Sequence, residues 1–244
     1  MNLYPKKITF FVQCLIDGMY PVVGHDFVRV FERLGIDVDC PSKQTCCGQP
    51  AFNTGYRSDA KRAAMHFVQV FENAEVIVCP SGSCVDMVRN HYPELFNDDS
   101  RWYNRAKRVS EKIFEFAEYL VDVLKVKDVG AVYNGKVAYH ESCHLSRFLG
   151  VKDQPRELLS HVRGLTLVDL AKADKCCGFG GTFSVKYPEI SAAIAEEKVD
   201  NIMASGADTV TGCDISCLMN IDGILKRRNA SIKALHIAQI LASE

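Results

Sequence analysis

The chain has 244 residues, of which 48% are hydrophobic and 24% are charged, so it is long enough to bury a substantial core in one large or two small domains. Its formal net charge of -1 and its pI near 6.7 provide no basic surface of the kind that binding to nucleic-acid phosphates requires. These values exclude nucleic-acid binding and indicate an ordinary globular protein.

The first predicted element is a buried strand at residues 8–12. This apolar run is too short for the hydrophobic region of a signal peptide, and the polar residues Gln13 and Asp17 follow it closely. No segment of the sequence approaches the roughly 20 apolar residues of a membrane-spanning helix. We therefore expect a cytoplasmic protein without a membrane span.

Eleven cysteines are a high and odd number for a compartment that keeps thiols reduced, which favours metal or redox chemistry over a disulfide framework. The pattern begins with two Cys-Cys-Gly turns, at Cys46-Cys47 and Cys176-Cys177. A leading cysteine precedes each turn: 31 residues lie between Cys14 and the first turn, and 32 lie between Cys143 and the second. Each leading cysteine ends a strand-like run.

A closing pair of cysteines follows each turn after a second strand-like run. In the first half the pair is Cys79 and Cys84, and in the second it is Cys213 and Cys217. Ten of the eleven cysteines therefore obey one repeated spacing, and only Cys40 falls outside it. The chain is predicted to be an internal duplication.

The segments between the cysteines repeat as well. Each turn is preceded by one run of apolar residues with helical spacing and followed by another. Before the first turn these apolar residues are Phe27, Val30, Phe31 and Leu34, and Gly35 is placed to end the helix. Before the second turn they are Leu158, Leu159 and Val162, with Pro155 at the predicted helix start and Gly164 at its end. The positions after the turns are Ala64, Phe67, Val68 and Phe71, and Ile194, Ala195, Val199, Ile202 and Met203. Each half is predicted to run strand, helix, strand, Cys-Cys-Gly loop, helix, strand.

Alternating strands and helices predict an α/β protein made of two similar Rossmann-like halves with parallel sheets, related by a pseudo-two-fold duplication. Because the carboxyl ends of parallel strands meet at one edge of a sheet, all five cysteines of a half are expected at the same edge.

Between the halves, an amphipathic helix is predicted with Ser110 as its N-cap and apolar residues from Ile113 to Leu124. We expect this helix to pack across the joint. The predicted domains are residues 1–125, which include this helix, and residues 126–244.

Five thiols at one edge suit an iron–sulfur cluster better than zinc. A tetrahedral zinc site needs only four ligands, whereas several irons can use a fifth thiolate as a bridge. Gly48 and Gly178 would let the backbone approach the cluster, and Gly180 and Gly181 would aim amide N–H groups at sulfur. The run "GFGG" lacks the spacing of a dinucleotide-binding motif.

The segments "QTCCGQPAFNTGY", "PSGSCVDMVRNHYP", "YHESCHLSR" and "CCGFGGTFSVKYPEIS" resemble the cysteine-rich CCG-domain family, which includes one of the subunits of heterodisulfide reductase. Within that family they are similar to the lactate-utilisation protein A branch. The resemblance covers nearly the whole chain. It implies an iron–sulfur electron-transfer subunit of an oxidoreductase complex that converts L-lactate to pyruvate, without full activity alone. Its partners would be a ferredoxin-like iron–sulfur subunit and a third subunit.

The resemblance also implies two sets of metal ligands, each holding a [4Fe–4S] cluster of the non-cubane type. The first set would be Cys14, Cys46, Cys47, Cys79 and Cys84, and the second Cys143, Cys176, Cys177, Cys213 and Cys217. The closing pairs depart from the family's Cys-x-x-Cys spacing, so Cys79 and Cys213 are the least secure ligands. A four-cysteine set would also accept zinc or a cubane cluster, and some relatives hold zinc at the first site.

Other residues near the repeat have two interpretations each. His140 and His144 flank Cys143 and would donate to cluster sulfur or relay a proton; the alternative is a histidine satisfied by backbone. Arg147 and Lys186 would hold a carboxylate such as lactate, or they are solvated. Cys40 is expected in the core at a strand end. No catalytic residue is assigned.

Three functions remain open from the sequence. The first is an electron-transfer subunit of a lactate-oxidising complex. The second is a thiol–disulfide redox enzyme similar to heterodisulfide reductase, which would need a disulfide substrate. The third is a zinc-stabilised interaction module without a redox role.

Overall fold

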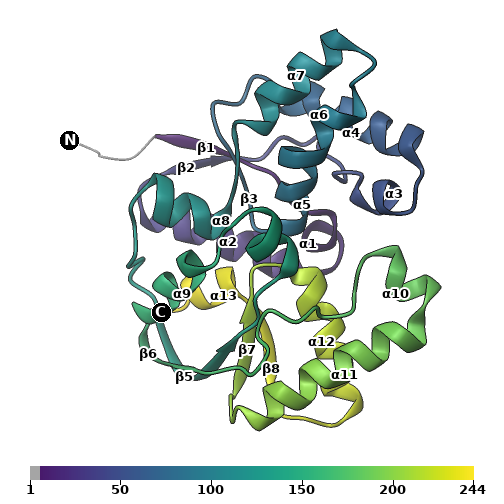
Figure 1. The fold of residues 1–244 in the computed structure, drawn as a ribbon. Coiled ribbons are helices and arrows are strands. Elements are labelled where there is room, and N and C mark those ends of the chain that lie inside the picture. Colours follow the sequence, from purple (N-terminus) through teal and green to yellow (C-terminus); the bar gives the residue numbers. More distant parts are fainter. Residues whose placement is uncertain (1–5) are drawn as a thin grey trace.

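The computed structural model describes residues 6–244 and shows two halves, each built on a four-stranded parallel sheet (Figure 1). The strands of the first half are β1 (Lys7–Phe10), β2 (Asp37–Asp39), β3 (Ile77–Cys79) and β4 (Ile113–Glu115), in the order β2-β1-β3-β4. Those of the second half are β5 (Val132–Tyr139), β6 (Arg163–Val168), β7 (Thr209–Gly212) and β8 (Lys233–His236), in the order β6-β5-β7-β8. The matching strand orders confirm the predicted α/β class and the two similar halves.

Parallel pairing also places equivalent strand ends together. In the first half Thr9 of β1 pairs with Ile77 of β3, and in the second Val137 of β5 pairs with Thr209 of β7. The loops that carry the cysteines leave the carboxyl ends of these central strands and of the neighbouring edge strands β2 and β6, so they meet at one edge of each sheet.

The helices of the first half include the two long amphipathic ones that the sequence predicts, α2 and α4. They are α1 (Cys14–Met19), α2 (Pro21–Arg33), α3 (Gln49–Asn53), α4 (Arg57–Phe71), α5 (Gly82–Asp86), α6 (Tyr92–Leu95), α7 (Ser100–Ser110) and α8 (Phe116–Glu118), with π-helical η1 (Met87–His91) and η2 (Tyr119–Val123). Gly35 follows α2 with a φ of +72°, as expected for a helix end.

The helices of the second half are η3 (His144–Phe148), α9 (Asp153–Ser160), α10 (Thr182–Lys186), α11 (Pro188–Ala204), α12 (Ile215–Arg227) and α13 (Ile237–Leu241). The prediction that Gly164 ends the helix before the turn is wrong, because α9 ends at Ser160 and Gly164 lies within β6. Met203, predicted on the apolar face of α11, is exposed, whereas Lys198 is fully buried on that face.

The predicted three strands per half are also wrong, since each sheet has a fourth strand. The segment from Ile113 to Glu115, predicted as the first turn of a helix, is β4, and Ser110 is the last residue of α7. The carboxylate of Glu115 then caps the following helix by accepting from the amides of Ala117 (2.7 Å) and Glu118 (3.2 Å). A strand of three residues leaves too little alternation to be recognised before such a helix.

The two halves share one hydrophobic core. Phe10, Phe27 and Phe116 of the first half lie in the same buried cluster as Tyr139 and Ile237 of the second. Phe116 begins α8, so the segment between the halves does pack across the joint. Two further clusters fill the outer faces, one around α4 and α7 and the other around α11 and α12.

The proposed boundary between the halves lies in residues 125–131, which form neither helix nor strand. Arg33 of α2 ties this region together by donating to the backbone carbonyls of Val129 (3.1 Å), Leu241 (3.0 Å) and Ala242 (2.9 Å). Within residues 6–244, no helix combines the length and the apolar character that crossing a membrane would take.

Candidate metal centres

Eight of the ten repeated cysteines line a single cavity of about 280 Å³ between the two halves. The cavity-lining cysteines are Cys14, Cys46, Cys47, Cys84, Cys143, Cys176, Cys177 and Cys217. All are free thiols. The duplication therefore brings four thiols from each half to the same space.

In the first half, helix starts and one turn hold the four thiols. Cys14 is the first residue of α1, and Cys84 lies in the first turn of α5. The Sγ atoms of Cys14 and Cys46 are 3.8 Å apart, and those of Cys47 and Cys84 are 3.5 Å apart. In tetrahedral coordination with metal–sulfur bonds of about 2.3 Å, neighbouring sulfurs would be about 3.8 Å apart, so these pairs are spaced for shared metal binding.

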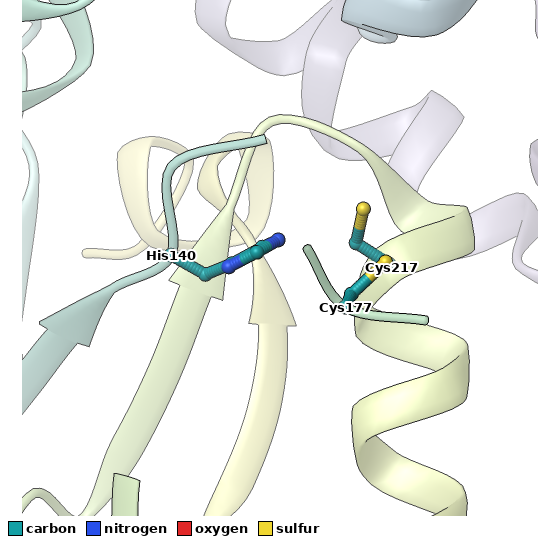
Figure 2. A group of neighbouring side chains, drawn as sticks. All are labelled: His140, Cys177 and Cys217. Atoms are coloured by element: carbon teal, nitrogen blue, oxygen red, sulfur yellow. The ribbon is translucent and has the colours of Figure 1, made fainter. Parts of the chain in front are cut away.

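The second half repeats this arrangement. Cys143 immediately precedes η3, and Cys217 lies in the first turn of α12. The Sγ atoms of Cys177 and Cys217 lie within 4.8 Å of each other and of a ring nitrogen of His140. Figure 2 shows the imidazole directed toward both sulfurs.

Both Cys-Cys-Gly turns require glycine. Gly48 and Gly178 have φ values of +83° and +85°, a region that side-chain-bearing residues rarely adopt. A Cβ on Gly178 would lie 2.5 Å from the carbonyl oxygen of Ser191 in α11, and one on Gly48 would lie 2.9 Å from the Cβ of Ala63 in α4. The amides of Gly48 and Gly178 donate to the Sγ atoms of Cys46 (3.4 Å) and Cys176 (3.3 Å).

These contacts favour the thiolate form of the first cysteine of each turn. Hydrogen bonds from Cys14 and Cys47 lower the pKa of Cys46 to about 3, with a further contribution from the Gly48 amide. Hydrogen bonds from Cys143 and Cys177 lower the pKa of Cys176 to about 2. The thiolate is the form of cysteine that binds metals, so each half presents one such sulfur before any metal arrives.

Cys79 and Cys213, the less secure members of the predicted sets, lie at the expected strand ends but do not line the cavity. Both are fully buried in the hydrophobic core. Burial is the main cause that raises the pKa of each thiol. The Sγ of Cys213 lies 3.7 Å from the hydroxyl of Tyr139.

The two closing loops are joined at the wall of the cavity by Asp214, a residue that sequence patterns did not single out. Asp214 is 1% exposed and caps α12. Its Oδ2 accepts from the backbone amide of Ser83 (3.0 Å) and the hydroxyl of Ser81 (3.4 Å), both in the first half. At another side of the cavity, the hydroxyls of Thr54 and Thr182 are 3.0 Å apart. These contacts fix the two thiol sets relative to each other.

The second set has two buried basic side chains beside it, and only one of them was expected. Burial lowers the pKa of His140 to about 3, so the imidazole is neutral. Burial also lowers the pKa of Lys198 to about 8. The Nζ of Lys198 donates to the carbonyls of Lys172 (2.5 Å) and Ala173 (3.0 Å). Lys198 could have been noticed in the sequence, because a lysine stands there on the apolar face of the helix predicted after the second turn.

The remaining candidates lie outside the thiol sets. The prediction that Cys40 belongs to the core is wrong, because its side chain is exposed after β2. Arg147 donates to the carbonyl of Asp174 (2.8 Å), and Lys186 is exposed. Gly180 and Gly181 line the cavity, as does His144, whose Nδ1 lies 3.6 Å from the Sγ of Cys143.

Comparison with known proteins agrees with the duplication. The model of a family described as "Cysteine-rich domain" (CCG) matches residues 8–89 and again residues 137–222. A crystal structure of a hypothetical protein from Helicobacter pylori shares the fold, with a TM-score of 0.69 and 12% identity, over 98% of this chain and 48% of that one.

Relatives with much higher identity cover nearly the whole length of the chain. The chain is 50% identical to "Lactate utilization protein A" of Bacillus cereus, over 97% of this chain and 99% of the relative. It is 50% identical to the protein of the same name from an Exiguobacterium strain, over 96% of each, and 48% identical to the one from a Geobacillus strain, over 97% of this chain and 99% of the relative. The chain therefore belongs to the cysteine-rich CCG-domain family, in the branch of proteins named lactate utilization protein A.

Proposed function

We propose that this chain is the iron–sulfur electron-transfer subunit of a complex that oxidises L-lactate to pyruvate. The observation that carries the proposal is the meeting of eight thiols from two Cys-Cys-Gly repeats in one cavity. Such a set supplies sulfur ligands for two centres at close range. Iron–sulfur centres accept and release single electrons, which is the chemistry they would add here.

The donor set fits such centres. Each half offers four thiols, one of them with a low pKa, and a backbone N–H directed at that sulfur. Amide hydrogen bonds to sulfur tune the reduction potential of an iron–sulfur centre. The low-pKa sulfurs of Cys46 and Cys176 would bind first, and the remaining thiols would lose their protons as metal binds.

The openness of the cavity favours a redox centre over structural zinc. Structural zinc sites are closed tetrahedra buried by their own ligands. Here Cys14 is exposed, and Cys46, Cys143 and Cys176 are half-buried, so the thiols remain accessible from outside. An accessible centre suits electron exchange with a partner.

We propose eight ligands, four in each half. Cys79 and Cys213 are reserve candidates for the fifth position of each set, because the repeated spacing includes them, although both are buried and neither lines the cavity. The lactate substrate and the complex are proposed from the printed names of the relatives. The expected partners are a ferredoxin-like iron–sulfur subunit and a third subunit, as in the family that the sequence resembles.

Two other functions have some support. The sulfur–sulfur distances of 3.5 and 3.8 Å suit a single tetrahedral zinc ion at the first set as well as a cluster. A disulfide-reducing enzyme would use the same open cavity, with a substrate sulfur placed between the two sets.

The test is anaerobic purification followed by iron, sulfide and zinc analysis, and growth on lactate of a host that lacks the gene. We expect a brown protein that dithionite bleaches, and growth restored by the wild type but not by Cys47→Ser or Cys177→Ser. A zinc-only protein whose cysteine variants still restore growth would contradict the proposal. Reduction of a low-molecular-weight disulfide by the isolated protein would favour the disulfide-reducing enzyme.

A further inference from the structure

The two thiol sets differ in one respect despite the duplication. Three residues before the leading cysteine, the first half has Phe11 and the second has His140. Phe11 packs edge-on against Phe67 of α4, with ring centroids 4.7 Å apart. The residue of α11 equivalent to Phe67 is Lys198, because the buried positions of α4 and α11 follow the same spacing. An aromatic pair behind the first set is thus replaced by two basic side chains behind the second.

His140 is placed to contact a metal centre. Its side chain is 1% exposed, and neither ring nitrogen makes a hydrogen bond of normal geometry within the described residues; the ring interacts more weakly with the backbone of Ala173. One ring nitrogen lies within 4.8 Å of the Sγ atoms of Cys177 and Cys217 (Figure 2). An unpaired buried imidazole is costly, and a sulfur-rich centre held by these two cysteines would accept its N–H.

Lys198 adds a positive charge on the same side. Its side chain is fully buried, and its charged form is favoured first by the Asp174 carboxylate and then by the thiols of Cys177, Cys217 and Cys176. That interaction is reciprocal, so the ammonium group favours negative charge on the sulfurs. The carboxylate of Asp214 bonds to both halves. Its negative charge also acts on Cys143 of the second set, and in that respect it opposes Lys198.

Hydrogen bonds to sulfur and nearby positive charge both stabilise the reduced state of an iron–sulfur centre, which carries one more negative charge than the oxidised state. We propose that His140 and Lys198 make the second centre the one with the higher reduction potential, so that electrons pass from the first centre to the second. In this transfer the first centre loses one electron and the second gains it. The inference rests on the proposed function.

The experiment is a redox titration of the anaerobically prepared protein, followed by EPR, with Cys46→Ser and Cys176→Ser assigning the signals to the first and second centres. We expect the second centre to have the higher midpoint potential in the wild type. The variant His140→Phe places the residue of the first half at this position. In this variant the equilibrium constant for reduction of the second centre should fall about tenfold, which lowers its midpoint potential by about 59 mV for one electron. The first centre should not change.

Matched variants separate these effects from general ones. Lys198→Met should lower the potential of the second centre in the same direction, and it carries the test if His140→Phe loses that centre. Lys233→Met removes an exposed lysine at the amino end of β8, whereas the thiols lie at the carboxyl ends of the strands. This variant should change neither potential. His140→Gln keeps an N–H donor, so the potential of its second centre should lie between those of the wild type and His140→Phe.

Equal or reversed potentials in the wild type, or a second centre unaffected by both His140→Phe and Lys198→Met, would overturn the inference and leave the proposed function intact. A protein that binds no iron would instead contradict the proposed function itself.

Discussion

Substitution of Asp214 by alanine should separate the two thiol sets. The Asp214 carboxylate accepts two hydrogen bonds across the joint, from the Ser83 amide and the Ser81 hydroxyl, and two within its own half, from the amide (3.3 Å) and hydroxyl (2.6 Å) of Ser216. Alanine would leave these buried donors without an acceptor and would remove the N-cap of α12.

The expected loss in the free energy of unfolding can be worked out from the same contacts. A lost N-cap destabilises by about 1 kcal/mol, and hydrogen bonds to a charged group contribute about 1.5–3 kcal/mol each. Because the longer bonds are weak, we expect Asp214→Ala to reduce the free energy of unfolding by about 3–5 kcal/mol. Ser81→Ala is the matched control. It removes the equivalent cap of α5 and one bond to Asp214, and should cost about 1 kcal/mol.

Urea unfolding of the metal-free protein, followed by circular dichroism, measures both values. The iron content of the two variants after reconstitution shows whether the cavity survives. Asp214→Ala should lose iron from both centres, since its side chain fixes both closing loops. A destabilisation no larger than that of Ser81→Ala, with full iron content, would refute the view that this carboxylate holds the two sets together.

Three further predictions concern the turns, the reserve cysteines and pH. Gly178→Ala should lower the thermal unfolding temperature more than Gly206→Ala does. Both glycines have positive φ, but only Gly178 lies close to a neighbouring backbone. Equal losses of thermal stability would contradict the close-approach argument. Cys79→Ala and Cys213→Ala should keep the wild-type iron content, because neither sulfur lines the cavity; loss of iron would make them ligands. Burial raises the pKa of Glu115 from 4.5 to about 8, so the stability that its protonated form contributes is complete below pH 4.5 and is lost as the pH rises toward 8. Glu115→Gln should flatten this part of the stability profile, and an unchanged slope in urea unfolding would show that Glu115 is not its source.

Sequence spacing predicted the elements that carry strong periodic signals. Helices α2 and α4 bury the residues whose spacing predicted them, except Leu34, which follows α2 and is half-buried. The repeated cysteines predicted the duplication. The fourth strand of each sheet was not predicted because β4 has only three residues and β8 has four. Each is followed directly by a helix, and the apolar residues of strand and helix form one continuous apolar pattern in the sequence. Gly164 was misplaced because a glycine within a strand resembles a helix end when only the sequence is known.

The cysteines that line the candidate site were predictable from the sequence, but the surroundings of the site were not. Strand ends converge for reasons of topology, so eight thiols could be expected together. The separation of Cys79 and Cys213 from the cavity depends on where a side chain points after a strand ends, which spacing does not encode. Asp214 and Lys198 owe their importance to contacts between segments far apart in the chain, and those contacts exist only in the folded structure.

The central claim is that each half holds its own iron–sulfur centre. EPR spectra with iron, sulfide and zinc analysis, on anaerobically prepared wild type, Cys46→Ser and Cys176→Ser, test it most directly. The account predicts two signals in the wild type and the loss of a different one in each variant. A wild-type protein that stays colourless and free of iron after anaerobic reconstitution would contradict it.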